Sequence, residues 1–345
     1  METQSEIKTK KEKIKNLLQI VISLGLGVWV FYLVYKELDI EEMQGIFKTA
    51  QWAYIIIPIF LCVFSSYIRA LRWNMLIEPV APTPKTKNTF CAVMVGYLVN
   101  HIFPRAGEVA RCGVLKNYEK APMTVLFGTV ITERAFDMLV TLIFVLLTIV
   151  VEFDRFHNIL SEFNLQDKIL GILSNPIIWI AMAVCVILLL LICKKASHWG
   201  FLQKIKSMLL GIWNGLKSFT QVRNKPLFLF YSFFIFIIYY LMLYTSFWMF
   251  DFTSDLTLGA GLVIYVFGAL GMIAPVQGGI GTYEFMTIQA MALYGISATQ
   301  SGSFAILSHL VEIIVNCVVG FVCFLILPLI NKEREKTLNS TTFLR

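Results

Sequence analysis

The stretch GYLVNHIFPRAGEVAR, residues 96–111, begins as an apolar membrane segment and ends in a charged segment. Pro104 interrupts the apolar run, and Arg105, Glu108 and Arg111 follow at steps of three. Proline is favoured at the first turn of a helix, and a spacing of three places side chains along one helical face. The stretch therefore predicts that one helix ends before Pro104 and that a second, charged helix begins directly after it.

The composition of the 345-residue chain is typical of a protein that crosses a membrane several times. Hydrophobic residues make up 57% of it and charged residues only 15%, whereas soluble domains carry about a quarter charged residues. Several uncharged runs are long enough to span a bilayer. The net charge of +7 comes from basic residues in short segments between apolar runs, so we expect topology-setting loops and no nucleic acid partner.

The sequence carries no recognisable metal, cofactor or nucleophile motif. The seven cysteines form no C-x-x-C pair and the four histidines lack zinc-ligand spacing. No phosphate-binding loop and no G-x-S-x-G or H-E-x-x-H string occurs. We therefore expect no metal, no cofactor and no enzymatic activity, and we interpret the cysteines as small buried residues.

The distribution of lysine and arginine predicts which ends of the apolar runs are cytoplasmic. Five lysines between residues 8 and 15 precede a first span, residues 17–35, which places the N-terminus inside. A mainly acidic loop then lies outside, and the span 52–76 returns to a basic segment inside. A full crossing by residues 89–103 would put the basic segment 194–225 outside. The conflict disappears if residues 88–115 form a re-entrant hairpin that turns near Asn100–Pro104.

The remaining apolar runs complete the predicted fold. They are the spans Val125–Val151, Pro176–Cys193, Leu227–Phe250 and Phe304–Ile330, and a second re-entrant hairpin within Leu256–Ser297 that is broken at Pro275, Gly278, Gly279 and Gly281. The fold class is thus an all-α polytopic membrane protein with about six full spans and two re-entrant helical hairpins. Both termini are cytoplasmic in this topology.

The order of the elements predicts an inverted-topology repeat within a single membrane domain, residues 1–345. Residues 17–151 and 176–330 each give span, span, hairpin, span, and the hairpin tips IFPRAG and IAPVQG share I-x-P-x-x-G. Residues 194–226 form an amphipathic linker suited to an anionic cytoplasmic leaflet, and residues 331–345 a short cytoplasmic tail. Inverted repeats with broken helices are typical of transporters.

The two hairpins carry the first candidate binding residues. Arg105, Glu108 and Arg111 leave one surplus positive charge beside a helix start, which suits a phosphate; the alternative is a set of cytosolic ion pairs that fixes the hairpin. The glycines of the second hairpin let the backbone approach a ligand, with Glu284 as the residue for direct chemistry. The alternative there is a tight turn between packed helices.

The spans carry the other candidates. Glu133 and Asp137 share a helical face beside Arg134, and we expect one carboxylate to pair with Arg105 or Arg111, in a structural or a functional role. Ionisable residues at membrane depth are costly and usually paired.

The string RALRW places two further candidates, Arg69 and Arg72, where their span ends. They either snorkel beside an interfacial tryptophan or contact a headgroup at a cytoplasmic mouth. His309, Glu312 and Asn316 lie on one face of the last span. His309 and Glu312 there either carry protons or lock two helices together.

These strings together resemble the lysylphosphatidylglycerol synthase transmembrane-region family over about residues 15–330. RALRW, VGYLVNHIFPRAGEVAR, ERAFD and PVQGGIGTYE occur in that order. The resemblance implies a bacterial or archaeal membrane protein that moves polar or isoprenoid lipids between leaflets. The residues matching the family's motifs are Asn100, Pro104, Arg105, Gly107, Glu108, Arg111, Glu133, Arg134, Asp137, Pro275, Gly278, Gly279, Gly281 and Glu284.

The sequence thus predicts a lipid flippase of a bacterial cytoplasmic membrane, whose cargo is a phosphate-bearing lipid held between the hairpin tips. The family's soluble synthase domain is missing here, so we expect a separate lipid-synthesising enzyme as a partner. Two alternatives remain open at this stage. One is a membrane-embedded lipid-modifying enzyme, a transferase or phosphatase, and the other is an ion-coupled carrier of small solutes.

Overall fold

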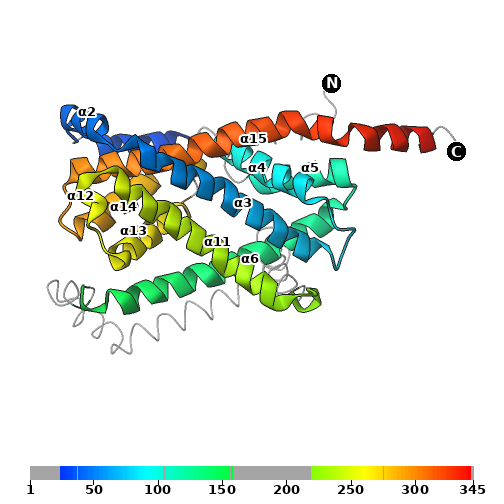
Figure 1. Cartoon of the computed structure of the whole chain (residues 1–345), viewed down its shortest axis with the longest axis horizontal. Helices are drawn as coiled ribbons and strands as arrows, with labels where there is room; N and C mark the ends of the chain where they lie inside the picture. Colours follow the sequence, from blue (N-terminus) through cyan, green and yellow to red (C-terminus); the bar gives the residue numbers. More distant parts are fainter. Residues whose placement is uncertain are drawn as a thin grey trace, which may run out of the picture.

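The structure, a computed structural model, describes residues 24–36, 38–103, 106–155, 157, 219–274 and 276–342, with side chains to residue 332. Every regular element in these ranges is a helix (Figure 1). The longer helices are Leu24–Tyr35, α2 (Ile40–Thr49), α3 (Ile56–Ile77), α4 (Thr86–Ile102), α5 (Gly107–Glu119), α6 (Met123–Val151), α11 (Lys225–Ser246), α13 (Leu258–Gly271), α14 (Thr282–Ala292) and α15 (Ala298–Thr342). Short elements are η1 (Trp52–Ile55), η2 (Phe219–Gln221), η3 (Phe247–Met249), α12 (Asp251–Ser254) and η4 (Gln277–Gly279).

Several sequence predictions lie outside the described residues. They are the span Pro176–Cys193, the basic linker up to residue 218, the N-terminal lysines, and Pro104, Arg105 and Pro275.

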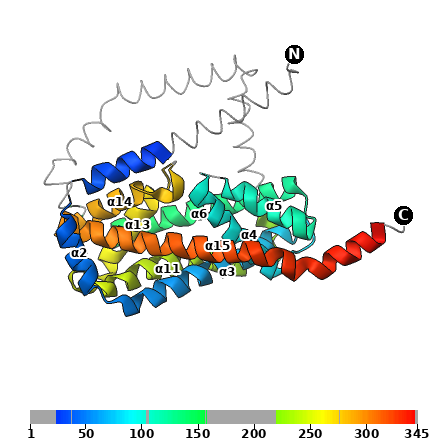
Figure 2. The same ribbon diagram turned by 90° about the horizontal axis from the view of Figure 1, so that it is seen from above.

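Four of the described helices are long and apolar enough to cross a membrane: Trp52–Ile77, Met123–Val151, Lys225–Met249 and Ala298–Lys332. Leu24–Tyr35 and Leu258–Gly271 are shorter apolar helices. The prediction of an all-helical, multi-span membrane protein is therefore confirmed. The segment predicted as a tail continues α15 as far as Thr342, and this end of the helix runs beyond the rest of the described bundle (Figure 2).

The helices α4 and α5 form an antiparallel pair, the first hairpin. At its open end Asn88 Nδ2, near the start of α4, donates to Glu119 Oε1, at the end of α5, over 2.6 Å. At its tip the Gly107 N–H donates to Asn100 Oδ1 over 2.7 Å. The two helices approach closely because Gly96 and Gly107 face each other without side chains. The prediction of a helix, a break and a charged helix is confirmed.

The helices α13 and α14 form the second hairpin. Thr282 Oγ1, at the start of α14, donates to the Gly271 carbonyl at the end of α13 over 2.8 Å. The connection between them takes left-handed backbone angles, with φ of +58° at Gly278 and +85° at Gly281. Glycine is the residue that adopts such angles without a Cβ clash, so the break falls where the glycines predicted it.

The remaining long helices pack against one another and against the two hairpins. The helix α3 packs along α11 and α4 packs along α15 (Figures 1 and 2). The two hairpin tips meet, because Gln277 Nε2 of η4 donates to the Ile102 carbonyl of α4 over 3.2 Å. Two segments 175 residues apart in sequence are thereby joined.

The helix α2 was not expected from the sequence. The acidic loop after the first span folds into α2, because Asp39 accepts hydrogen bonds from the backbone N–H groups of Glu41 and Glu42 and so caps the helix.

The open end of the first hairpin gives a stability prediction. Asn88 and Asn331 exchange amide hydrogen bonds of 2.9 and 3.0 Å, which tie α4 to α15. We expect Asn88→Ala to lower the free energy of unfolding by about 1 kcal/mol, since a buried amide and carboxylate then lose a partner. Thermal unfolding in detergent measures this, with the exposed Lys87→Ala as control. Equal midpoints for the two variants would contradict the prediction.

Candidate functional site: a central cavity beside buried ion pairs

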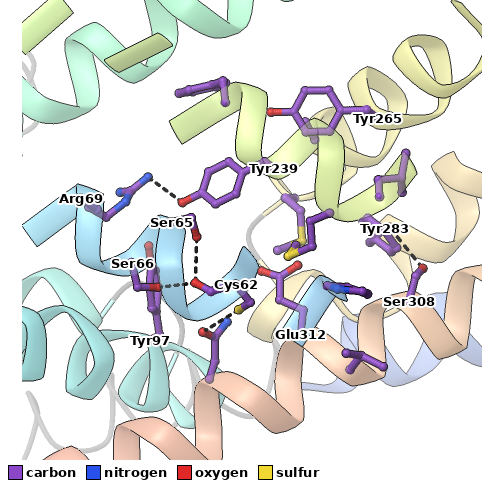
Figure 3. Close-up of a pocket in the computed structure, with 18 of the residues that line it drawn as sticks. Cys62, Ser65, Ser66, Arg69, Tyr97, Tyr239, Tyr265, Tyr283, Ser308 and Glu312 are labelled. Carbon is purple, nitrogen blue, oxygen red and sulfur yellow. Dashed lines mark hydrogen bonds between the residues drawn. The ribbon is translucent and has the colours of Figure 1, made fainter. Parts of the chain in front are cut away.

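A cavity of about 340 Å³ lies among α3, α4, α6, α11 and the second hairpin with α15. We call it the central cavity (Figure 3). Its charged lining residues are Arg69 of α3, Arg134 and Asp137 of α6, and Glu312 of α15. Charged side chains inside a bundle that spans a membrane are costly unless they have a function or are paired.

An ionic cluster lies against one part of this cavity and is built around Glu133, whose side chain is fully buried. Its carboxylate lies 2.8 Å from Arg69 Nη1, 3.1 Å from Arg111 Nη1 and 3.0 Å from Arg134 Nη2. Arg72 Nη2 lies 3.5 Å away. One carboxylate from α6 thus holds arginines of three helices, and the expected pairing of Glu133 with Arg111 is observed.

Asp137, one turn along α6, provides the second carboxylate of this cluster. Its Oδ1 accepts from Arg72 Nη2 over 2.7 Å, and its Oδ2 lies 3.5 Å from both Arg69 Nη1 and Arg134 Nη1. The snorkelling interpretation of Arg69 and Arg72 is wrong, since their side chains are only 6% and 0% exposed. Arg69 lines the cavity, whereas Arg72 lies behind it and also donates to Ser232.

The cluster has more positive than negative charge. Its four guanidinium groups face two buried carboxylates, and Glu108, a third acid, lies 3.8 Å from Arg134 with 33% of its side chain exposed. Among the described side chains, buried guanidinium N–H groups without a hydrogen-bond partner remain on Arg69, Arg72, Arg111 and Arg134. Such an excess of donors is the electrostatic condition for binding an anion.

Arg111 is held away from the cavity. Its guanidinium carbon lies 4.5 Å from the centre of the Trp73 ring, a cation–π arrangement, and it pairs with Glu133. Trp73 is fully buried and donates to Thr129. Of the residues expected in the first hairpin, Glu108 and Arg111 therefore border the cluster, Asn100 closes the tip, and Arg105 lies outside the described residues.

The glycine-rich tip of the second hairpin is tied to α15. Glu284 Oε2 accepts from the Gly281 N–H over 2.6 Å, and Glu284 Oε1 lies 2.7 Å from His309 Nδ1. His309 Nε2 lies 2.8 Å from the Gly278 carbonyl. Glu284 is thus buried inside the hairpin and does not line the cavity, and the partner of His309 is Glu284 and not Glu312.

Glu312 and Asn316 instead line the central cavity. Asn316 Oδ1 accepts from the Cys62 thiol at 3.7 Å. The Glu312 carboxylate has no hydrogen-bond or ion-pair partner among the described residues, and it points into the middle of the cavity in Figure 3. The cavity therefore contains an unpaired acid as well as the two arginines.

Sequence reasoning missed the hydroxyl groups of the cavity. Tyr97, Tyr239, Tyr265 and Tyr283 line it (Figure 3), and Arg69 Nη2 donates to the Tyr239 hydroxyl over 3.2 Å. The only available signal was a tyrosine inside each apolar run, and these runs contain many aromatic residues. Helix period alone does not distinguish a lining tyrosine from one that faces lipid.

Comparison with known proteins places most of the chain in a family of membrane proteins. Residues 16–320 match the family described as the lysylphosphatidylglycerol synthase TM region. A UPF0104 membrane protein of Methanocaldococcus jannaschii is 24% identical, covering 96% of this chain and 99% of its own length. A second UPF0104 membrane protein, of Methanothermobacter thermautotrophicus, is 22% identical, covering 84% of this chain and 90% of its own length.

A shorter match links the chain to a larger protein. The glycosyltransferase AglD of Haloferax volcanii is 26% identical over 38% of this chain, which corresponds to 21% of that protein. No solved structure matches the chain.

Proposed function

This chain belongs to the lysylphosphatidylglycerol synthase transmembrane-region family, and from that premise we propose that it is a lipid translocase. Its cargo is a polar or isoprenoid-linked lipid with a phosphate-bearing headgroup, which it moves between leaflets without changing it chemically. The chain is a multi-pass membrane protein, and the relatives named above are archaeal. We place it in the cytoplasmic membrane of a prokaryotic cell.

The observation that carries the proposal is the central cavity, whose wall includes two arginines of the ionic cluster. Arg69 and Arg134 line the cavity and belong to a cluster with more cations than buried anions. A phosphate in the cavity would accept hydrogen bonds from the guanidinium groups of Arg69 and Arg134, the two arginines of the cluster that line it. The cavity volume of about 340 Å³ is in the range of a small-molecule site. The cavity holds the headgroup while the long apolar tails of the lipid stay in the bilayer.

We further propose that the fold is an inverted repeat with six full spans and two re-entrant hairpins, both termini being cytoplasmic. The contacts support this arrangement, since α4 of the first half packs on α15 of the second, and α13 of the second packs on α6 of the first. The matching helices α3 and α11 pack on each other. Both halves also pair an ionisable residue of the second hairpin helix with the last span, through Arg111–Glu133 and Glu284–His309.

Movement of one repeat against the other would expose the cavity to each leaflet in turn. In this mechanism the guanidinium group of Arg134, whose side chain is 43% exposed, exchanges part of its contact with Glu133 and Asp137 for the phosphate. The exchange leaves no arginine without an anion, which keeps the cost of a charged headgroup within the bilayer low. A separate enzyme supplies the lipid.

Translocation by purified protein in vesicles tests the proposal. With a fluorescent phospholipid as probe, we expect Arg134→Gln to slow transbilayer movement about tenfold, because one charge-assisted hydrogen bond to phosphate is worth about 1.5–3 kcal/mol. Arg155→Gln is the matched control, since Arg155 is 41% exposed, pairs with Glu152 and does not line the cavity. Mass spectrometry of the lipid after the assay distinguishes transport from chemistry.

Equal movement in vesicles with wild-type protein and in empty vesicles would exclude a translocase for that class of lipid. A chemically altered probe would favour the membrane-embedded enzyme in its place.

A further inference from the structure

Both ring nitrogens of His309 face oxygen atoms that accept hydrogen bonds. Nδ1 lies 2.7 Å from Glu284 Oε1, and Nε2 lies 2.8 Å from the Gly278 carbonyl oxygen. Turning the ring over would put carbon atoms against both oxygens and lose both bonds. A carbonyl oxygen only accepts, so Nε2 must carry a hydrogen and donate it to Gly278.

The contact with Glu284 requires a second proton. An unprotonated Nδ1 and a carboxylate 2.7 Å apart would be two acceptors facing each other, which is repulsive. The other carboxylate oxygen, Oε2, already accepts from the Gly281 N–H. One proton therefore lies in the bond between Nδ1 and Oε1, and the Glu284–His309 pair has no net charge whichever of the two atoms holds it. Neutrality suits a pair whose side chains are 4% and 1% exposed.

This proton holds the tip of the second hairpin to α15. Gly278 and Gly281, the two glycines tied by the pair, both have left-handed backbone angles and lie on either side of the connection. Gln277, beside them, contacts the tip of the first hairpin. Loss of the proton leaves His309 with one N–H for two acceptors, so either Glu284 or the Gly278 carbonyl must move away.

We propose that the Glu284–His309 pair is a proton-binding site that fastens the second hairpin, so that translocation is coupled to binding and release of a proton. This inference rests on the proposed lipid translocase, for which it names the coupling ion. Release transfers the shared proton to an acceptor on the cavity side. Glu312 lies one helical turn further along α15, lines the cavity and has no partner among the described residues, so its carboxylate is positioned to receive it.

Other titratable groups surround the pair. The Tyr283 ring of α14 packs against the His309 ring, with ring centres 4.6 Å apart and the two planes tilted by 39°. Tyr35 of the first described helix donates to the Gly302 carbonyl of α15. His101, at the end of α4 in the first hairpin, lies against Gly278 of the second hairpin. The buried Nδ1 of His101 has no partner among the described residues. A charge on His101 would oppose a charge on His309, so His101 must be tested separately.

Hydrogen exchange of the tip tests for the proton without using transport. In wild type the opening equilibrium of residues 276–284 should rise about tenfold per pH unit between the pH at which the opened pair loses its proton and the higher pH at which the closed pair loses it, because one proton is lost on opening in that range. His309→Gln keeps one donor but cannot titrate, so its exchange should follow only the intrinsic pH dependence. His101→Asn should retain the wild-type slope. A pH-independent opening in wild type from about pH 5 to about pH 10, a range that brackets an ordinary histidine pKa of about 6.5, would overturn the proton site.

Transport in vesicles tests the coupling. An imposed pH gradient of about one unit should change the rate of lipid movement by wild type up to about tenfold, and should leave the rate of His309→Gln unchanged. Movement in wild type that is indifferent to the gradient would overturn the coupling and leave the translocase standing. If wild type moves no lipid, the translocase and the coupling fail together, while the exchange slope still decides whether the proton site exists.

Discussion

Replacing Glu133 by Gln is expected to lower the free energy of unfolding by about 3–5 kcal/mol, the cost of breaking a buried ion pair from one side. Glutamine has nearly the same shape, so the change removes charge and little volume. In the wild-type protein the Glu133 carboxylate lies within 3.5 Å of four guanidinium groups. Without the Glu133 charge, Asp137 is the one buried carboxylate of the cluster that remains among the described residues. The repulsion among the four arginines is then no longer balanced.

The measurement is the midpoint of thermal or denaturant unfolding in detergent, with Glu108→Gln as the matched control. Glu108 is the same residue type near the same cluster, but its side chain is 33% exposed and lies 3.8 Å from Arg134. An exposed pair at that distance is worth less than about 1 kcal/mol. If both variants unfold together, Glu133 does not hold the cluster, and the arginines are stabilised by groups outside the described residues.

The sequence predicted which helical faces carry charge, because helix period depends only on spacing. RALRW puts Arg69 and Arg72 on one face, and ERAFD does the same for Glu133 and Asp137. It did not predict that these two faces meet, since the contact depends on how α3 packs against α6. Arg69 and Arg72 were therefore expected near the surface, whereas both are buried against the carboxylates.

The hairpins were predictable for a different reason. The distribution of lysine and arginine between loops excluded a full crossing for the first hairpin. Proline and glycine marked where the chain turns in both hairpins. The partners at the tips were not predictable in the same way. His309 was expected beside Glu312 because they share a helix face, but Glu284 lies closer in space, and no pattern within α15 reports a residue from α14.

Replacing Gly107 by Ala is expected to destabilise the first hairpin by about 1–3 kcal/mol, the cost of overpacking a closely packed site. A Cβ at this position would overlap the carbonyl oxygen of Gly96 and lie 2.5 Å from Asn100 Cγ. The overlap with Gly96 involves backbone and cannot be relieved by turning a side chain. The helices α4 and α5 would have to separate, and the hydrogen bond from the Gly107 N–H to Asn100 would be lost.

The control is the same substitution six residues further along the same helix. A Cβ at Gly113 meets no atom within 4 Å, so Gly113→Ala should stabilise α5 by about 0.5–1 kcal/mol, the intrinsic advantage of alanine in a helix. Unfolding midpoints in detergent should thus move in opposite directions for one chemical change on one helix. A stabilising shift in both would mean that helix propensity, and not the close approach of α4 and α5, governs this hairpin. The tip would then be free to open without cost, and the meeting of the two hairpins at Ile102 and Gln277 would need another support.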